Sequence, residues 1–127
     1  MRVSDLVRDY IRTNIATSYL PAITWNEGQS PFINGDSSVI FTKQTGRSVD
    51  AYVRQADVEV LLFSKKNSSL VDLNNLSADA EAVLEYIKSN FAISENLRIS
   101  ITQDVTGPYN TSQNRYFYRM SVLTYSE

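Results

Sequence analysis

The chain has 127 residues, of which 43% are hydrophobic and 20% charged, so its length and composition predict one globular domain with its own core. It contains neither cysteine nor histidine, which excludes disulfides, thiolate and imidazole metal sites, and mechanisms that use a histidine base. The net charge of −2 offers no basic excess to bind a phosphate backbone, so specific nucleic-acid binding is disfavoured.

The first segment predicts an amphipathic helix from residue 3 to about residues 18–20, where Pro21 ends the pattern. Its apolar stripe consists of Val3, Leu6, Val7, Tyr10, Ile11 and Ile15. Residues 24–36 then predict an irregular segment with a tight turn at Asn34-Gly35. Trp25 lies in this segment, and we interpret it as a packing anchor, the alternative being a contact with a partner.

A short apolar strand at residues 38–42 is followed by a polar connection at residues 43–48. Residues 52–63 predict the next strand, because apolar and polar side chains alternate there over most of its length. The predicted buried face consists of Ala56, Val58, Val60 and Leu62, and the opposite face of Gln55, Asp57 and Glu59. Leu61 and Phe63 break the polar face, so we expect that end of the strand to be covered.

After a polar loop at residues 65–69, the pattern predicts a second helix at about residues 72–90. Its apolar stripe is Leu73, Leu76, Ala80, Val83, Leu84, Ile87 and Phe91. Asp72, Asn75 or Ser77 can serve as the N-cap, and Asn90 can adopt the left-handed conformation after the last turn.

Leu97, Ile99 and Ile101 predict a third strand, and residues 106–114 a turn-rich loop. The last strand, residues 115–125, is expected to turn Tyr116, Tyr118, Met120 and Val122 toward the core. The elements therefore predict an α+β fold in which two helices cover one face of a mostly antiparallel sheet of about four strands, in the order α-β-β-α-β-β. A helix-length crossover between the second and third strands leaves room for these two to lie parallel, which would make the sheet mixed.

The one candidate for chemistry is a pair of carboxylates, Asp57 and Glu59, on the same face of one strand. Such a pair could bind a metal or act in acid–base catalysis. Nothing else in the sequence supplies a third ligand, so we interpret both as solvated residues of a strand face and expect neither a cofactor nor a metal.

Four stretches carry a resemblance to a known family. Residues 39–48 read VIFTKQTGRS and residues 52–63 read YVRQADVEVLLF; a helix at 78–91 and the closing stretch YRMSVLTY at 118–125 follow. Together they resemble the tail terminator and minor tail proteins of long-tailed bacteriophages. In that family a strand runs into a T-G-[GR]-x-S-type turn, and a V-x-V-x-[VLF] strand and a helix follow. The resemblance covers about residues 38–125, and Arg47 stands where a second glycine is common.

The resemblance implies a non-enzymatic protein that forms a hexameric ring on the end of the tail tube, stops its growth and presents a surface for head joining. Its implied partners are further copies of itself, the major tail tube protein and a head-completion or connector protein, with genome DNA passing through the ring. Its implied location is the head-proximal end of the tail in the virion, and the host cytoplasm during assembly. A connector or completion ring protein and a carboxylate-metal enzyme remain alternatives.

A ring requires surfaces that mate head to tail, and we expect them in the polar loops 43–48, 65–69 and 107–114. The candidate interface residues are Lys43, Thr45, Arg47, Lys65, Lys66, Tyr109, Arg115 and Trp25. No apolar run is long enough to cross a membrane, and acidic residues interrupt the start of the chain where a signal peptide would be apolar. We therefore expect a protein kept at first in a cytoplasm, with no membrane partner.

Overall fold

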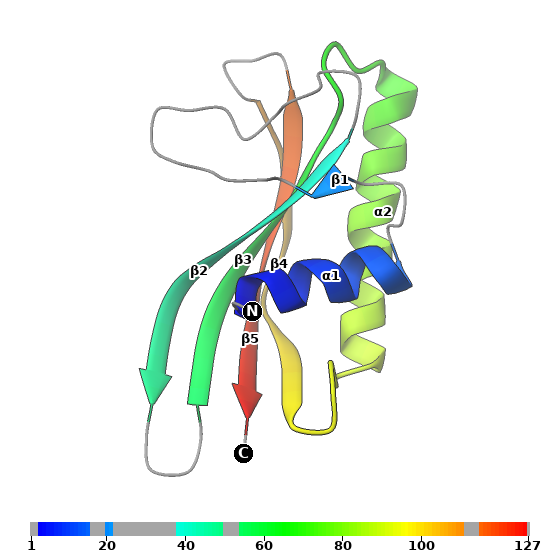
Figure 1. Cartoon of the computed structure of the whole chain (residues 1–127). Helices are drawn as coiled ribbons and strands as arrows, with labels where there is room; N and C mark the ends of the chain where they lie inside the picture. The colour runs from blue at the N-terminus through cyan, green and yellow to red at the C-terminus, as the bar shows by residue number, and fades with distance from the viewer. Residues whose placement is uncertain (1–2, 16–19, 22–37, 50–53, 111–114, 127) are drawn as a thin grey trace.

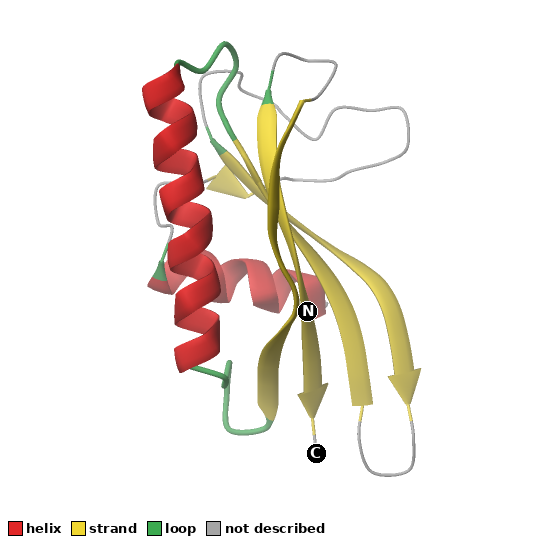
Figure 2. Cartoon of the chain, turned by 180° about the vertical axis from the view of Figure 1, so that it is seen from behind, coloured by secondary structure: helices red, strands yellow, loops and turns green. Residues whose placement is uncertain are grey.

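The computed structural model describes residues 3–15, 20–21, 38–49, 54–110 and 115–126. In chain order its elements are α1 (Val3–Asn14), β1 (Leu20–Pro21), β2 (Val39–Val49), β3 (Arg54–Phe63), α2 (Leu70–Ser89), β4 (Leu97–Asn110) and β5 (Tyr116–Ser126). The strands form one sheet in the order β1-β2-β3-β5-β4. Both helices lie on the same face of this sheet (Figure 1), and the view from behind in Figure 2 shows the opposite face of its long strands without a helix. The predicted α+β class is thus confirmed.

The sheet is mixed, but for a different reason from the one considered on sequence. β5 lies between β3 and β4 and pairs with each in antiparallel register, so β3 and β4 run in the same direction without touching as neighbours. The parallel pair is instead β1 with β2, which align Leu20 with Val39 and Pro21 with Ile40. β1 has only two residues, too few to show a periodic pattern in the sequence.

The alternation of β3 separates its two faces as predicted. Val58, Val60 and Leu62 are fully buried beneath the helices, and Ala56 is 6% exposed. Gln55 and Asp57 are exposed on the other face, where Glu59 is half-buried. Because β3 is flanked by β2 and β5, both of its edges are hydrogen-bonded and its inward side chains have neighbours on every side.

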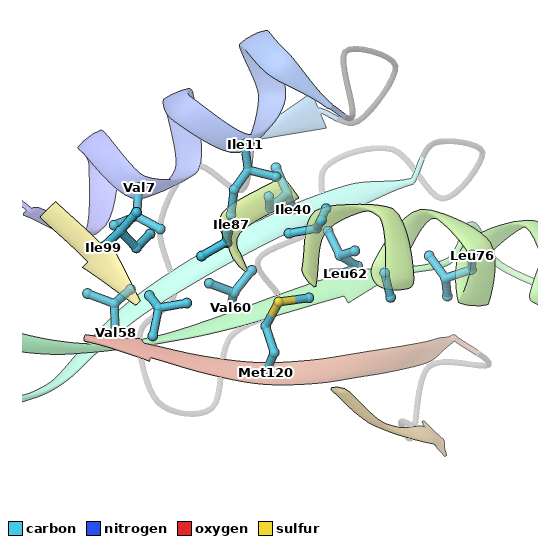
Figure 3. Packing of buried hydrophobic residues seen from close by; sticks show 13 residues of the cluster. Val7, Ile11, Ile40, Val58, Val60, Leu62, Leu76, Ile87, Ile99 and Met120 are labelled. Carbon is cyan, nitrogen blue, oxygen red and sulfur yellow. The ribbon is translucent and has the colours of Figure 1, made fainter. Parts of the chain in front are cut away.

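One hydrophobic core fills the space between the sheet and the two helices. Figure 3 shows Val7 and Ile11 of α1, Leu76 and Ile87 of α2, and strand residues such as Val60 gathered in it. Met120 and Val122 of β5 are fully buried in the same cluster, and Tyr118 packs against it. The predicted inner face of the last strand is confirmed for these three residues, whereas Tyr116, half-buried like Tyr118, is not among the residues packed against this cluster.

A smaller cluster lies on the other face of the sheet. It consists of Val39, Leu61 and Phe63, which are 5%, 6% and 1% exposed, with Phe41 and Phe117 packed against them. The rings of Phe63 and Phe117 lie 5.0 Å apart. The prediction that this end of β3 is covered is therefore confirmed.

α1 ends at Asn14, several residues before the predicted end. Asn14 Nδ2 donates to the carbonyl of Tyr10 at 2.8 Å. α1 is held to β2 by Thr42, whose hydroxyl donates to the Ser4 carbonyl at 2.6 Å, and to the end of α2 by Tyr10, whose hydroxyl donates to the Asn90 carbonyl at 2.8 Å. Burial, with the neighbouring Tyr86, raises the pKa of Tyr10 to about 12.

α2 begins at Leu70, two residues before the expected start, and its N-cap is Ser69 rather than Asp72, Asn75 or Ser77. Ser69 and Asp72 form a reciprocal capping box, in which each side chain accepts a hydrogen bond from the backbone N–H of the other. At the other end Asn90 has φ −132°, so the expected left-handed conformation is wrong. The C-cap is stabilised instead by hydrogen bonds from the Asn90 backbone N–H and Nδ2 to the Tyr86 carbonyl.

β2 and β4 are longer than predicted. Residues 43–48, expected as a loop, continue β2 along β3 with a bulge between Gln44 and Gly46. Residues 102–110 continue β4 along β5 with three irregularities of register, so the expected loop at 106–114 begins only after Asn110; residues 111–114 lie outside the described part of the chain. Backbone pairing with a neighbour keeps these polar segments extended, although they lack the apolar alternation that identifies a strand in a sequence.

The face assignment of β3 predicts that neighbouring substitutions have very different effects. Val60→Asp should unfold the domain, because it places a charge without a partner at a fully buried position and costs several kcal/mol. Glu59→Gln should leave unfolding nearly unchanged, because its side chain lies on the opposite face. Thermal and urea unfolding would measure the stability of both variants. Equal losses of stability would contradict the assignment of Val60 and Glu59 to opposite faces of β3.

Candidate functional site

The carboxylates Asp57 and Glu59 lie on the helix-free face of β3. Asp57 is exposed, and Glu59 stands opposite Lys43 in the register of β2 and β3. Gly46 lies so close to Asp57 that a Cβ there would be 2.9 Å from Asp57 Oδ2, which fits a bulge that brings the β2 backbone against this side chain. Within the described residues, no group of three or more Asp, Glu, His or Cys side chains is placed to hold a metal ion.

The first predicted interface segment belongs to the strand β2 and not to a loop. Lys43 and Thr45 are exposed, and the Thr45 hydroxyl donates weakly to the Asp57 carbonyl at 3.4 Å. Arg47 pairs with Ala56 through its backbone, while its side chain lies outside what the structure describes. These residues therefore form part of a strand at the β2 side of the sheet.

The second predicted segment is a true connection, between β3 and α2. Lys65 and Lys66 are both exposed there. Asn67 turns the chain with a φ of 54°, and the Ser68 hydroxyl donates to the Lys65 carbonyl at 2.7 Å. Lys65 Nζ lies 3.6 Å from Asp72 Oδ2 in the first turn of α2. The connection thus presents two lysines directly beside the helix start.

Tyr109 lies near the end of β4 and remains 40% exposed. Its ring lies 5.3 Å from that of Phe117, and the guanidinium of Arg119 lies 5.8 Å from the Tyr109 ring centre. An aromatic side chain held by packing on one side and open on the other is suited to a protein contact.

Arg115 is fully buried, so its prediction as an interface residue is wrong. Its Nη1 donates to the Ser64 carbonyl at 3.0 Å, and the backbones of Ser64 and Tyr116 are also hydrogen-bonded. Burial lowers the pKa of Arg115 from its ordinary value. Arg115 therefore joins the end of β3 to the start of β5 inside the protein. Trp25, the remaining candidate, lies outside the described residues.

The predicted interface residues do not form one patch. Tyr109 pairs with Phe117, which pairs with Phe63 immediately before the Lys65–Lys66 connection. Arg47 aligns with Ala56, seven positions earlier on β3, which corresponds to about 23 Å along the strand. The candidates thus divide between two opposite ends of the sheet.

The structure also exposes apolar residues that the sequence did not single out. Leu70 and Val71, in the first turn of α2, are 74% and 67% exposed. Phe91 was expected on the buried stripe of the helix but is 58% exposed after its end, with the Arg98 guanidinium 5.9 Å from its ring centre. Recognising Ser69 as the N-cap in the sequence would have predicted the exposure of Leu70 and Val71, because this N-cap places both residues on the outer side of the first turn.

No described helix is both long and apolar enough to cross a membrane. No protein-family model matches the chain, and no curated protein matches it.

The carboxylates of Asp57 and Glu59 are predicted not to bind a metal ion. Asp57→Asn combined with Glu59→Gln should change the free energy of unfolding by less than about 0.5 kcal/mol, because neither side chain is buried in a charged network. Differential scanning fluorimetry with and without Mg²⁺, Mn²⁺ or Zn²⁺ would give the melting temperatures of the wild type and the double variant. A cation-dependent rise in melting temperature that the double variant loses would favour the metal-enzyme alternative.

The capping box predicts a defined pH dependence. Hydrogen bonds from the Ser69 backbone and hydroxyl, and then Lys65, lower the pKa of Asp72 from its ordinary value of 3.8. The ionised carboxylate therefore stabilises the fold above that ordinary value, and this contribution is lost as the pH falls through the lower, folded-state pKa. Asp72→Asn should remove this part of the acid dependence of urea unfolding. Asp79→Asn, on the same helix but outside the capping box, is the matched control and should retain it.

Proposed function

We propose that this protein is a structural component of a bacteriophage tail, which caps the growing tail tube as a ring, ends its polymerisation and provides the surface for head joining. The stretches that resemble tail terminators correspond to β2, β3, α2 and β5, which pack together around one core. The proposal thus concerns a compact unit rather than scattered matches.

The observation that carries an assembly role is the exposure of Leu70 and Val71 beside Lys65 and Lys66. Adjacent apolar side chains left in water provide area that a protein partner can bury. The basic residues next to them can select an acidic partner and accelerate the encounter.

The chemical inventory supports a structural protein over an enzyme. Histidine and cysteine are absent from the sequence, and the carboxylates Asp57 and Glu59 lie on an exposed sheet face. Among the described residues, no third ligand joins these two carboxylates to hold a metal.

A terminator must remain soluble until it meets a tube end, because premature polymerisation would consume it. Its contacts should therefore be individually weak, with roughly 800 Å² or less buried per partner. Such contacts become effective when a tube end holds several copies side by side, since each copy then meets its neighbour at a high local concentration.

Tail-tube assembly in vitro tests the proposed function. Purified major tail tube protein should form shorter tubes when this protein is added, and electron microscopy should locate the added protein at one tube end. Asp57→Asn with Glu59→Gln serves as a folded control and should shorten tubes as the wild type does.

The same preparation separates the terminator from the connector alternative. If the wild-type protein does not bind tube ends and instead binds portal-filled heads, its function is that of a head–tail connector. Protein that binds neither particle would overturn both.

A further inference from the structure

The first turn of α2 carries an apolar and basic surface. Leu70 and Val71 are 74% and 67% exposed, and Lys66 is exposed in the connection just before them. Lys65 Nζ lies 3.6 Å from Asp72 Oδ2, whereas no ion pair among the described residues involves Lys66. We refer to Lys66, Leu70 and Val71 as the α2 N-terminal patch.

The outward stripe of the same helix carries the opposite charge. Glu81 and Glu85 are exposed one turn apart, and the described residues contain no ion pair to either. Lys88, one turn further on, lies 3.8 Å from Asp104 instead. Two like charges at this spacing repel each other along the helix, so a cation from outside would be stabilising.

Short side chains accompany these glutamates. Ala78 and Ala82 are exposed on the same stripe, and they leave space for a larger apolar group to approach the helix backbone. We refer to Ala78, Glu81, Ala82 and Glu85 as the α2 acidic stripe. Its charge is opposite to that of Lys66 in the N-terminal patch.

The patch and the stripe cannot meet within one chain. Val71 and Ala82 are eleven residues apart on a continuous helix, which corresponds to about 16 Å along a rigid element. Their complementarity can therefore be satisfied between two copies. A head-to-tail contact, in which each copy uses the patch toward one neighbour and the stripe toward the other, can close into a ring, whereas a reciprocal contact of both surfaces would stop at a dimer.

The strand edges are less suited to joining copies. Beyond its pairing with β1, β2 presents Lys43 and the bulge at Gln44–Gly46, and β4 contains Pro108 and three irregularities of register. Lysine, bulges and proline are the features that keep edge strands from pairing with other chains. The apolar cluster of the helix-free face is already buried, so α2 is the better candidate for a contact.

We infer that the α2 N-terminal patch of one copy docks on the α2 acidic stripe of a second copy, with Lys66 facing Glu81 and Glu85 and the apolar pair covering Ala78 and Ala82. This inference rests on the proposed function, because it names the contact that joins neighbouring subunits of the ring. Its electrostatic part is exposed to solvent, so added salt weakens the association.

A charge exchange tests this contact on the full chain. Sedimentation velocity over a concentration series should show wild-type protein assembling at high concentration. Lys66→Glu alone, and Glu81→Lys with Glu85→Lys, should each raise the concentration needed for assembly by about tenfold or more. The triple variant, which exchanges the charges of both surfaces, should restore assembly toward wild type.

Two controls accompany the exchange. Glu95→Lys reverses an exposed glutamate in the connection between α2 and β4, outside both surfaces, and should assemble as wild type does. All variants should keep the wild-type melting temperature, since every substituted side chain is exposed. Val71→Ser should weaken assembly without lowering that temperature, which reports on the apolar part of the contact.

The outcomes separate the contact from the proposed function. Single charge variants that assemble like wild type, or a triple variant that stays dissociated, would overturn the contact even if the protein still shortens tail tubes. A species that stops at a dimer would overturn the head-to-tail arrangement in favour of a twofold one. Restored assembly in a protein that ignores tube ends would support the contact and overturn the terminator function.

Discussion

The central position of β3 is the constraint on which the remaining structure depends. Its inward residues Val58, Val60 and Leu62 are fully buried, and they form the floor against which both helices pack. Each such side chain contributes about 1.5–3 kcal/mol by leaving water, so the period-two pattern of one strand determines where both helices can lie. β2 and β5 then pair on either side, and β4 follows at the outer side of β5.

Placing both helices on one face divides the molecule into surfaces with different roles. The inner stripe of α2 is used for the core, which leaves its outer stripe as the most extended helical surface in the described part of the chain. On the helix-free face, the side chains at the end of the sheet near Phe63 are buried, whereas those in the middle of the sheet are polar. The capping box at Ser69 and Asp72 connects these features, since it starts the helix at Leu70 and so presents Leu70 and Val71 to solvent.

This distribution is consistent with a protein whose work is association. Lys66, Leu70 and Val71 lie on α2 and the connection before it, and a rigid surface loses little conformational entropy when it binds. Tyr109 adds an aromatic side chain, packed on Phe117, at the same end of the sheet as Lys65 and Lys66. Several weak contacts of this kind would suit the assembly at a tube end that is proposed above.

The sequence by itself determined the fold class, the faces of β3 and the inner residues of β5, because burial on one side of a strand requires alternating apolar residues. It also determined what chemistry is missing, since the absence of histidine and cysteine needs no coordinates. Only the tertiary structure decided that residues 43–48 are strand, because their extension comes from hydrogen bonds to β3 and not from their own pattern. It likewise decided that Arg115 is internal, since a buried arginine is stabilised by a distant carbonyl, that of Ser64, which no local pattern reveals.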